Sequence, residues 1–201
     1  AAVSQWADAG VPEARLRKAE ALRYLYLAGS EPAPFTGTPG DLLVVTSFFR
    51  DETEAHLKLL AEALQAGLLG NFRVTVKPHP YLPVQERLSG LLHGRTEGLR
   101  FSTAPIADEL ACNPLVWASN STTVALEAAI KGLPVMVMQP SGDFDLCPLQ
   151  NIKELPRTSN LDDVRAGLAS AAPLSLAPDY LLLDPSLTAW RTMLGLRHMG
   201  S

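Results

Sequence analysis

The stretch from Ala118 to Val137 reads ASNSTTVALEAAIKGLPVMV, and it joins two apolar runs through a helical pattern. The apolar run Leu115–Trp117 comes just before it, and five polar residues, Ser119–Thr123, follow that run at once. A helical pattern comes next, Gly132 ends it, and a second apolar run occupies Val135–Met138. This order predicts a buried strand, a helix and another buried strand.

The same alternation extends over most of the chain, with strands that are continuous apolar runs. Such strands are buried on both faces, which is typical of a parallel sheet covered by helices on both sides. We therefore predict an α/β fold with a Rossmann-like, doubly wound and mostly parallel sheet. The predicted strands are Leu42–Thr46, Phe72–Val76, Leu99–Phe101, Leu115–Trp117 and Val135–Met138, and the predicted helices are Pro12–Leu27, Asp51–Ala66, Val84–Leu92, Pro105–Ala111, Thr122–Lys131, Leu161–Ala171 and Pro185–Leu194.

Composition narrows the class of protein. The chain has 201 residues, 47% of them hydrophobic and 19% charged, and a formal net charge of -4. This charge gives no reason to expect nucleic acid as a partner, and the apolar runs are too short for a transmembrane segment. Two cysteines without a CxxC spacing fit a reducing compartment. We predict a soluble, cytoplasmic protein.

The predicted domain organisation has three parts. Residues 1–40 are interpreted as an interdomain helix followed by a linker rich in Gly and Pro. Residues 41–198 are predicted to form one Rossmann-like domain that binds a donor nucleotide. Residues 199–201, Met-Gly-Ser, are interpreted as a remnant of cloning.

Polar residues follow the ends of three predicted strands, in the segments Ser47–Glu52, Lys77–Pro80 and Ser119–Thr123. Ligands of parallel α/β sheets bind at the carboxyl ends of the strands. A helix start attracts anions, and small hydroxyl residues let a phosphate approach the backbone. The alternative is ordinary N-capping, which Ser, Thr and Asn also favour. Capping needs one such residue, whereas Ser119–Thr123 offers five.

Two further side chains have an ordinary and a functional interpretation. His79 lies between Pro78 and Pro80, which restrict the backbone on both sides, and Lys77 is beside it. This arrangement suits a phosphate oxygen, although a lone histidine in a loop is often incidental. Glu127 could pair with Lys131 at the i+4 position on a helix surface, or it could accept hydrogen bonds from the hydroxyls of a ribose.

The segments VKPHP and SNSTTVALEAAIKGLPV together resemble the carboxyl-terminal, nucleotide-binding half of GT-B-fold glycosyltransferases. The resemblance is to bacterial sialyltransferases, polysialyltransferases and related surface-carbohydrate transferases, which carry an HP motif and a downstream serine motif. It implies transfer of a sugar from a nucleotide-sugar, a CMP-sugar in these families, to a surface glycan. By this resemblance His79 would stabilise the leaving phosphate and Glu127 would hold the ribose. Together with the strand-end segments, it leads to these predicted substrate-binding residues: Lys77, His79, Pro80, Ser119, Asn120, Ser121, Thr122 and Glu127.

The chain departs from this family in one respect. The family places its catalytic base in an amino-terminal domain, which residues 1–40 are too few to form. We therefore expect the full-length protein to be the enzyme and this chain alone to be inactive. A UDP-sugar transferase or epimerase of the same fold is the alternative enzyme, and a non-catalytic sensor of nucleotides or phosphosugars is the alternative from another class.

No metal or other cofactor is expected, because helix dipoles and side chains can neutralise a leaving phosphate. Asp143-Phe144-Asp145 spells a DxD pattern, which holds a divalent metal in another glycosyltransferase fold. Gly142 and Pro148 surround it, and a polar turn is the interpretation we prefer.

Overall fold

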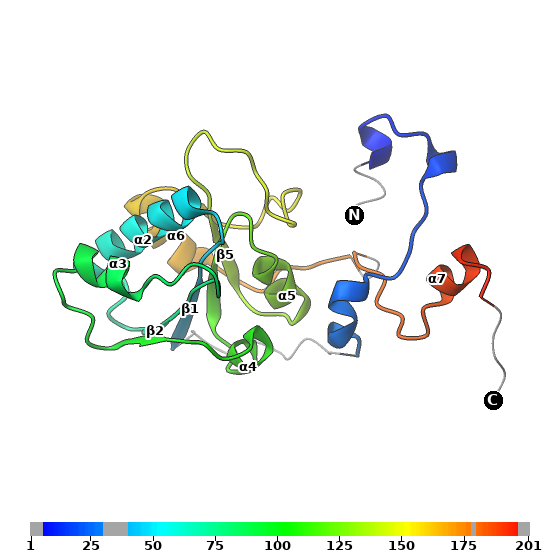
Figure 1. Ribbon diagram of the computed structural model, residues 1–201. Helices are drawn as coiled ribbons and strands as arrows, with labels where there is room; N and C mark the ends of the chain where they lie inside the picture. Colours follow the sequence, from blue (N-terminus) through cyan, green and yellow to red (C-terminus); the bar gives the residue numbers. More distant parts are fainter. Residues whose placement is uncertain (1–5, 30–39, 178–179, 197–201) are drawn as a thin grey trace. The chain divides into compact units, whose positions relative to one another are not determined.

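The protein is described by a computed structural model that covers residues 6–29, 40–177 and 180–196 (Figure 1). It divides into two compact units. One unit comprises Ala1–Glu31 with Leu176–Ser201, and the other comprises Pro32–Ser175. The sequence placed 41–198 in one domain, whereas the structure groups the segment from residue 176 onward with the amino-terminal unit. Most of the predicted linker and the interpreted cloning remnant lie outside the described residues.

The Pro32–Ser175 unit contains a sheet of six strands, all parallel, in the order β3-β2-β1-β4-β5-β6. This sheet confirms the predicted α/β, doubly wound fold, and the strand order is that of the Rossmann fold. The last strand was not predicted, because two residues are too few to give a hydrophobic pattern. The strands are β1 (Asp41–Val45), β2 (Arg73–Lys77), β3 (Leu99–Phe101), β4 (Leu115–Ser119), β5 (Val135–Met138) and β6 (Arg157–Thr158).

Helices cover both faces of the sheet, which explains why its central strands are apolar throughout. In Figure 1, α2 (Arg50–Gln65), α3 (Gln85–Leu91) and α6 (Leu161–Ser170) lie on one face of the sheet, and α4 (Ile106–Ala111) and α5 (Val124–Ile130) lie on the other. Leu42 and Val44 belong to the core beneath the first group, and neither is accessible to solvent.

The turn that closes α5 follows from its sequence. Gly132 has a φ of +70°, a conformation that residues with a Cβ rarely adopt. The Gly132 N–H donates to the Ala129 carbonyl and the Leu133 N–H donates to the Ala128 carbonyl, each at 3.0 Å. These two bonds form a Schellman motif. The expectation that Gly132 ends this helix is therefore confirmed.

The other unit differs from the prediction at its amino-terminal end. A single helix was expected from Pro12 to Leu27, but the structure has two 3₁₀ helices, η1 (Glu13–Arg15) and η2 (Leu22–Leu27). Between them, the carboxylate of Glu20 accepts hydrogen bonds from two backbone N–H groups at the start of α7 (Thr188–Met193). A residue that bonds to a distant segment in this way interrupts the helical pattern of its neighbours.

The helices in the described part of the chain are all too short or too polar to cross a bilayer.

Candidate functional site

The carboxyl ends of β1 and β4 lie side by side. The strands that follow β1 are added on one side of this pair, and the strands that follow β4 are added on the other side. Strand order reverses at this point, which is where doubly wound folds bind their ligands. The loops after the two strands touch, since the hydroxyl oxygens of Ser47 and Ser121 are 2.6 Å apart. The loops that follow β1 and β4 therefore meet at the carboxyl edge of the sheet.

A carboxylate joins this contact. Glu52, in the first turn of α2, accepts a hydrogen bond from the Ser121 N–H at 2.8 Å and another from the Ser121 hydroxyl at 2.6 Å. Because the Ser121 proton points to Glu52, the Ser47 hydroxyl must donate its own proton to Ser121. Ser47 in turn accepts a hydrogen bond from the Phe49 N–H at 3.0 Å. Both serine protons are therefore used within the protein.

Ser119 points into the interior instead of toward solvent. Its hydroxyl lies 2.8 Å from Nδ1 of His56, and both side chains are fully buried. The His56 ring packs edge-on against Trp117, with 4.8 Å between ring centroids. Burial lowers the pKa of His56 to about 3, so the ring is neutral at physiological pH. Ser119 thus anchors the end of β4 to α2.

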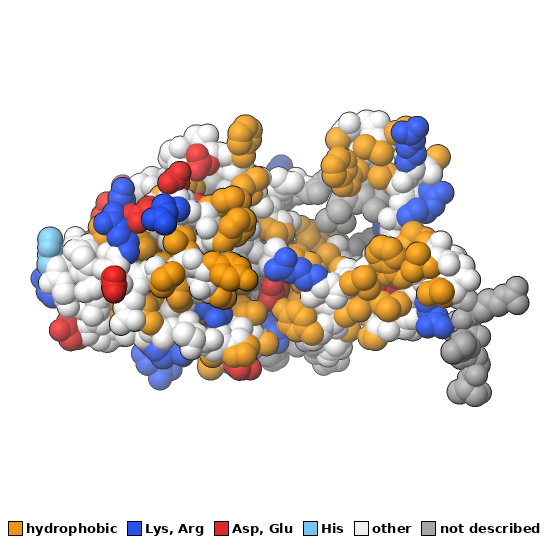
Figure 2. Space-filling view, in the orientation of Figure 1, with side chains coloured by type: hydrophobic (Ala, Val, Ile, Leu, Met, Phe, Trp, Pro, Cys, Tyr) orange, Lys and Arg blue, Asp and Glu red, His pale blue; other side chains and the backbone are white. Residues whose placement is uncertain are grey.

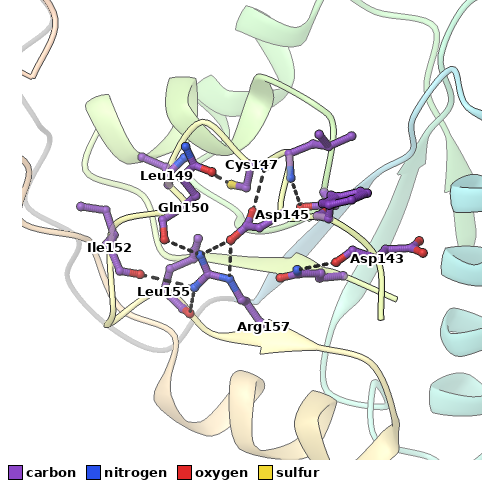
Figure 3. A network of polar contacts seen from close by, with 12 residues as sticks. Asp143, Asp145, Cys147, Leu149, Gln150, Ile152, Leu155 and Arg157 are labelled. Carbon is purple, nitrogen blue, oxygen red and sulfur yellow. Dashed lines mark hydrogen bonds and ion pairs between the residues drawn. The ribbon is translucent and has the colours of Figure 1, made fainter. Parts of the chain in front are cut away.

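Asn120 ties the β4–α5 loop to the long connection between β5 and β6. Its side-chain amide donates to the Phe144 carbonyl at 2.7 Å, and its oxygen accepts from the Leu146 N–H at 3.2 Å. The connection itself is organised around an ion pair between Arg157 and Asp145 at 2.8 Å (Figure 3). Arg157 also donates to the backbone carbonyls of Gln150, Ile152 and Leu155. The second aspartate of the DxD pattern is therefore committed to holding a loop.

The remaining residues of the hydroxyl run lie at the start of α5. Thr123 is the residue before the helix, and its side chain makes no capping hydrogen bond. Its hydroxyl instead donates to the carboxylate of Glu127 at 3.2 Å. Glu127 is only 5% exposed, a burial that does not suit an exposed pair with Lys131. Thr122 is half-buried, and its hydroxyl oxygen lies 3.4 Å from the Val124 N–H.

The segment after β2 brings His79 to the same edge of the sheet. Nδ1 of His79 accepts a long hydrogen bond, 3.4 Å, from the Tyr81 N–H. In the neutral ring the proton is then on Nε2, which can donate it. Pro80 is exposed beside it. The amine of Lys77 is already engaged within the protein, because it donates a hydrogen bond to the Ala104 carbonyl in the β3–α4 loop.

A hollow of about 800 Å³ lies at the opposite, amino-terminal edge of the sheet. Its walls include Asp41 and Arg73, which form an ion pair at 2.7 Å, and Arg100 and Glu109, which form another. These charged side chains are therefore already paired with one another. Since ligands of doubly wound sheets bind at the carboxyl ends of the strands, the candidate site is the edge that carries Ser47 and Ser121.

The sequence did not reveal two of the side chains that hold this edge together, Glu52 and His56. Glu52 ends one of the three polar segments that follow predicted strands, but nothing in the sequence connects it with Ser121. His56 had a usable signal, because it is four residues from Leu60 on the inward face of a predicted helix. A histidine at such a position is expected to be buried.

No protein-family model and no curated protein matches this sequence. Solved structures do resemble the chain. The UDP-GlcNAc 2-epimerase of Methanocaldococcus jannaschii, in complex with UDP-GlcNAc and UDP, matches with a TM-score of 0.58 and 11% identity over 94% of this chain. A putative UDP-N-acetylglucosamine 2-epimerase from Listeria monocytogenes matches with a TM-score of 0.56 and 13% identity over 98% of it.

The chain spans 56% and 58% of the lengths of these two proteins. At such low identity the likeness concerns the fold. It places the six-stranded sheet among Rossmann-like α/β domains of the kind that make up part of GT-B-type proteins.

Proposed function

We propose that the Pro32–Ser175 unit binds a nucleotide-sugar at the carboxyl edge of its sheet, as part of a carbohydrate-active enzyme with a GT-B-like fold. The observation that carries this proposal is the reversal of strand order between β1 and β4, where Ser47 and Ser121 are in contact. The fold neighbours support it, because one of them was solved with UDP-GlcNAc and UDP bound.

The residues at this edge would have different roles in binding the nucleotide-sugar. His79 would donate its Nε2 proton to a phosphate oxygen, and it would stabilise the charge that develops on the phosphate when the sugar leaves. Thr122, half-buried beside Ser121, would offer its hydroxyl to the same group. Glu127 would accept hydrogen bonds from the ribose hydroxyls. Ser119, Asn120 and Ser121 would hold the loop in place through their protein partners.

Two nucleotides are candidates, and different observations favour them. The fold neighbours are UDP-sugar epimerases by their descriptions, which favours a UDP-sugar and an epimerase or transferase reaction. The order of His79-Pro80 and the Ser119–Thr122 segment resembles transferases that use CMP-sugars, which favours a glycosyltransferase with a glycan acceptor. The same fold can serve either reaction, so ligand binding has to decide between them.

Calorimetric titration of UMP, UDP and CMP into the purified chain tests the proposal. We expect at least one of them to bind, and the preference between uridine and cytidine nucleotides to select the candidate. Loss of one hydrogen bond to a charged group weakens binding by about 1.5–3 kcal/mol. The dissociation constant is then roughly ten- to hundredfold larger. His79→Ala and Glu127→Ala should each produce a loss of this size.

The two variants should differ in the ligand they affect. His79→Ala removes a phosphate contact, so binding of the bare nucleoside should not change. Glu127→Ala removes a ribose contact, so nucleoside and nucleotide should both bind more weakly. Arg73→Ala, at the opposite edge of the sheet, is the control and should bind as the parent does. The proposal fails if no nucleotide binds, or if both site variants bind like the parent.

A further inference from the structure

Aromatic rings form a continuous strip at the carboxyl ends of β1 and β2. We call Phe49, Phe48, His79 and Tyr81 the aromatic strip. The ring centroids of Phe49 and Phe48 are 4.0 Å apart, those of Phe48 and His79 are 5.7 Å apart, and those of His79 and Tyr81 are 5.4 Å apart. Tyr81 is 90% exposed and Phe48 is 56% exposed. The strip therefore presents ring surface to solvent.

The exposed hydrophobic side chains of this unit are concentrated at one edge. Among its described residues, the large hydrophobic side chains with high exposure are Phe48, Phe49, Tyr81, Phe144 and Leu146. All of them lie in connections that follow β1, β2 or β5, at the carboxyl edge of the sheet. Figure 2 shows that hydrophobic side chains reach the visible surface in groups between charged ones. Of these side chains, Phe48, Phe49 and Tyr81 lie together in the aromatic strip, and exposed apolar groups gathered in one place mark a binding surface.

Backbone hydrogen bonds fix the two loops that carry the strip. The Phe49 N–H donates to the Ser47 hydroxyl, and the Thr53 hydroxyl donates to the Ser47 carbonyl at 2.8 Å. In the other loop, the Leu82 N–H donates to the His79 carbonyl at 2.9 Å, which forms a turn around Tyr81. The rings are thus presented by ordered backbone, and a ligand that stacks on them loses little free energy in ordering the loops.

We propose that the aromatic strip binds the sugar ring of the nucleotide-sugar, through contact between ring faces and the C–H groups of the sugar. This inference rests on the proposed function. His79, which is assigned to the phosphate, belongs to the strip itself, and its ring packs beside those of Phe48 and Tyr81. A sugar attached to a phosphate at His79 would therefore lie next to the rings of Phe48 and Tyr81. The negative face of an aromatic ring attracts the weakly positive C–H groups of such a ligand.

The position of Glu127 separates this proposal from stacking of the nucleobase. Glu127, assigned to the ribose, belongs to α5 and follows β4, whereas the strip follows β1 and β2. The strand order is β2-β1-β4, so the ribose would lie on the β4 side of the phosphate, whereas Phe48 and Tyr81 lie on the side of β1 and β2. The strip is then next to the sugar.

Paired titrations test this inference with the full chain. UDP is compared with UDP-GlcNAc, and CMP with CMP-N-acetylneuraminic acid, because each pair differs by the sugar. In Phe48→Ala and Tyr81→Ala, we expect binding of the bare nucleotide to change less than twofold. Binding of the nucleotide-sugar should weaken by about two- to tenfold, as expected for loss of one aromatic contact. Tyr81→Phe keeps the ring and should bind as the parent does.

Phe144→Ala is the matched control, because it removes an exposed ring from the connection after β5. It should leave the ratio of the two affinities unchanged. Equal weakening of nucleotide and nucleotide-sugar in the Phe48 and Tyr81 variants would mean that the strip holds the base or phosphate, and would overturn the inference. Unchanged affinities would also overturn it. A parent that binds none of the four ligands would instead refute the proposed function itself.

Discussion

The buried histidine beneath the site makes the stability of the protein depend on pH in a predictable way. His56 is fully buried against Trp117, and burial lowers its pKa from 6.5 to about 3. Between these two values the unfolded chain takes up a proton that the folded protein does not. The stability that depends on neutral His56 is therefore complete above pH 6.5 and declines as the pH falls toward 3.

The size of the effect follows from the two pKa values. Each pH unit within this window lowers the free energy of unfolding by about 1.4 kcal/mol. Because the decline begins near pH 6.5, lowering the pH from 7 to 5 should cost about 2 kcal/mol. Proteins of this size are stable by roughly 5–15 kcal/mol, so the loss is a large fraction of the total.

This loss of stability can be measured by urea unfolding of the parent and of His56→Asn at pH 5, 6 and 7. The Asn side-chain amide can occupy the place of Nδ1 next to Ser119, but it does not titrate. We expect the parent to lose about 2 kcal/mol more than the variant between pH 7 and pH 5. Acidic groups titrate equally in both proteins and cancel in the difference. Equal losses in parent and variant would refute the assignment of a neutral, buried His56.

Two further substitutions test ion pairs of the same unit, one in the hollow at the opposite edge of the sheet and one in the connection between β5 and β6. Arg100 and the Ser102 hydroxyl both bond to Glu109, and the bond from Arg100 is the main reason that the pKa of Glu109 is lowered. Glu109→Gln should lower the free energy of unfolding by about 1–3 kcal/mol at pH 7, and the difference in urea unfolding should shrink as the pH falls below 4.5. Arg157→Ala removes the ion pair with Asp145, so amides of 143–155 should lose hydrogen-exchange protection while α2 keeps its own.

The sheet could be predicted from the sequence because its strands carry their own signal. Leu42–Val45 and Val135–Met138 are continuous apolar runs, and burial on both faces of a parallel sheet requires such runs. The helix expected over Pro12–Leu27 had the right spacing of leucines, but the hydrogen bonds that Glu20 accepts from the start of α7 outweigh that local preference. Periodicity reports what a segment favours alone, and contacts with distant residues can override it.

The candidate site could be predicted as a place but not as a set of contacts. The sequence offered two uses for Ser119–Thr123, a phosphate site and a helix cap. The structure adds a third, since Ser119 contacts His56 and Ser121 contacts Glu52, residues 63 and 69 positions away. These pairs exist because β4 lies next to β1, which the strand order decides. No local pattern carries that information.

The position of Glu52 limits where a phosphate can bind at this edge. Its carboxylate accepts both donors of Ser121, so a phosphate that used the Ser121 N–H would displace Glu52 or lie about 4 Å from it. Two like charges at that distance repel by about 4 kcal/mol near a protein surface. One hydrogen bond to a charged group stabilises binding by only about 1.5–3 kcal/mol. A phosphate is therefore better placed toward His79 and Thr122, away from Glu52, and Ser121 then serves to hold the two loops together.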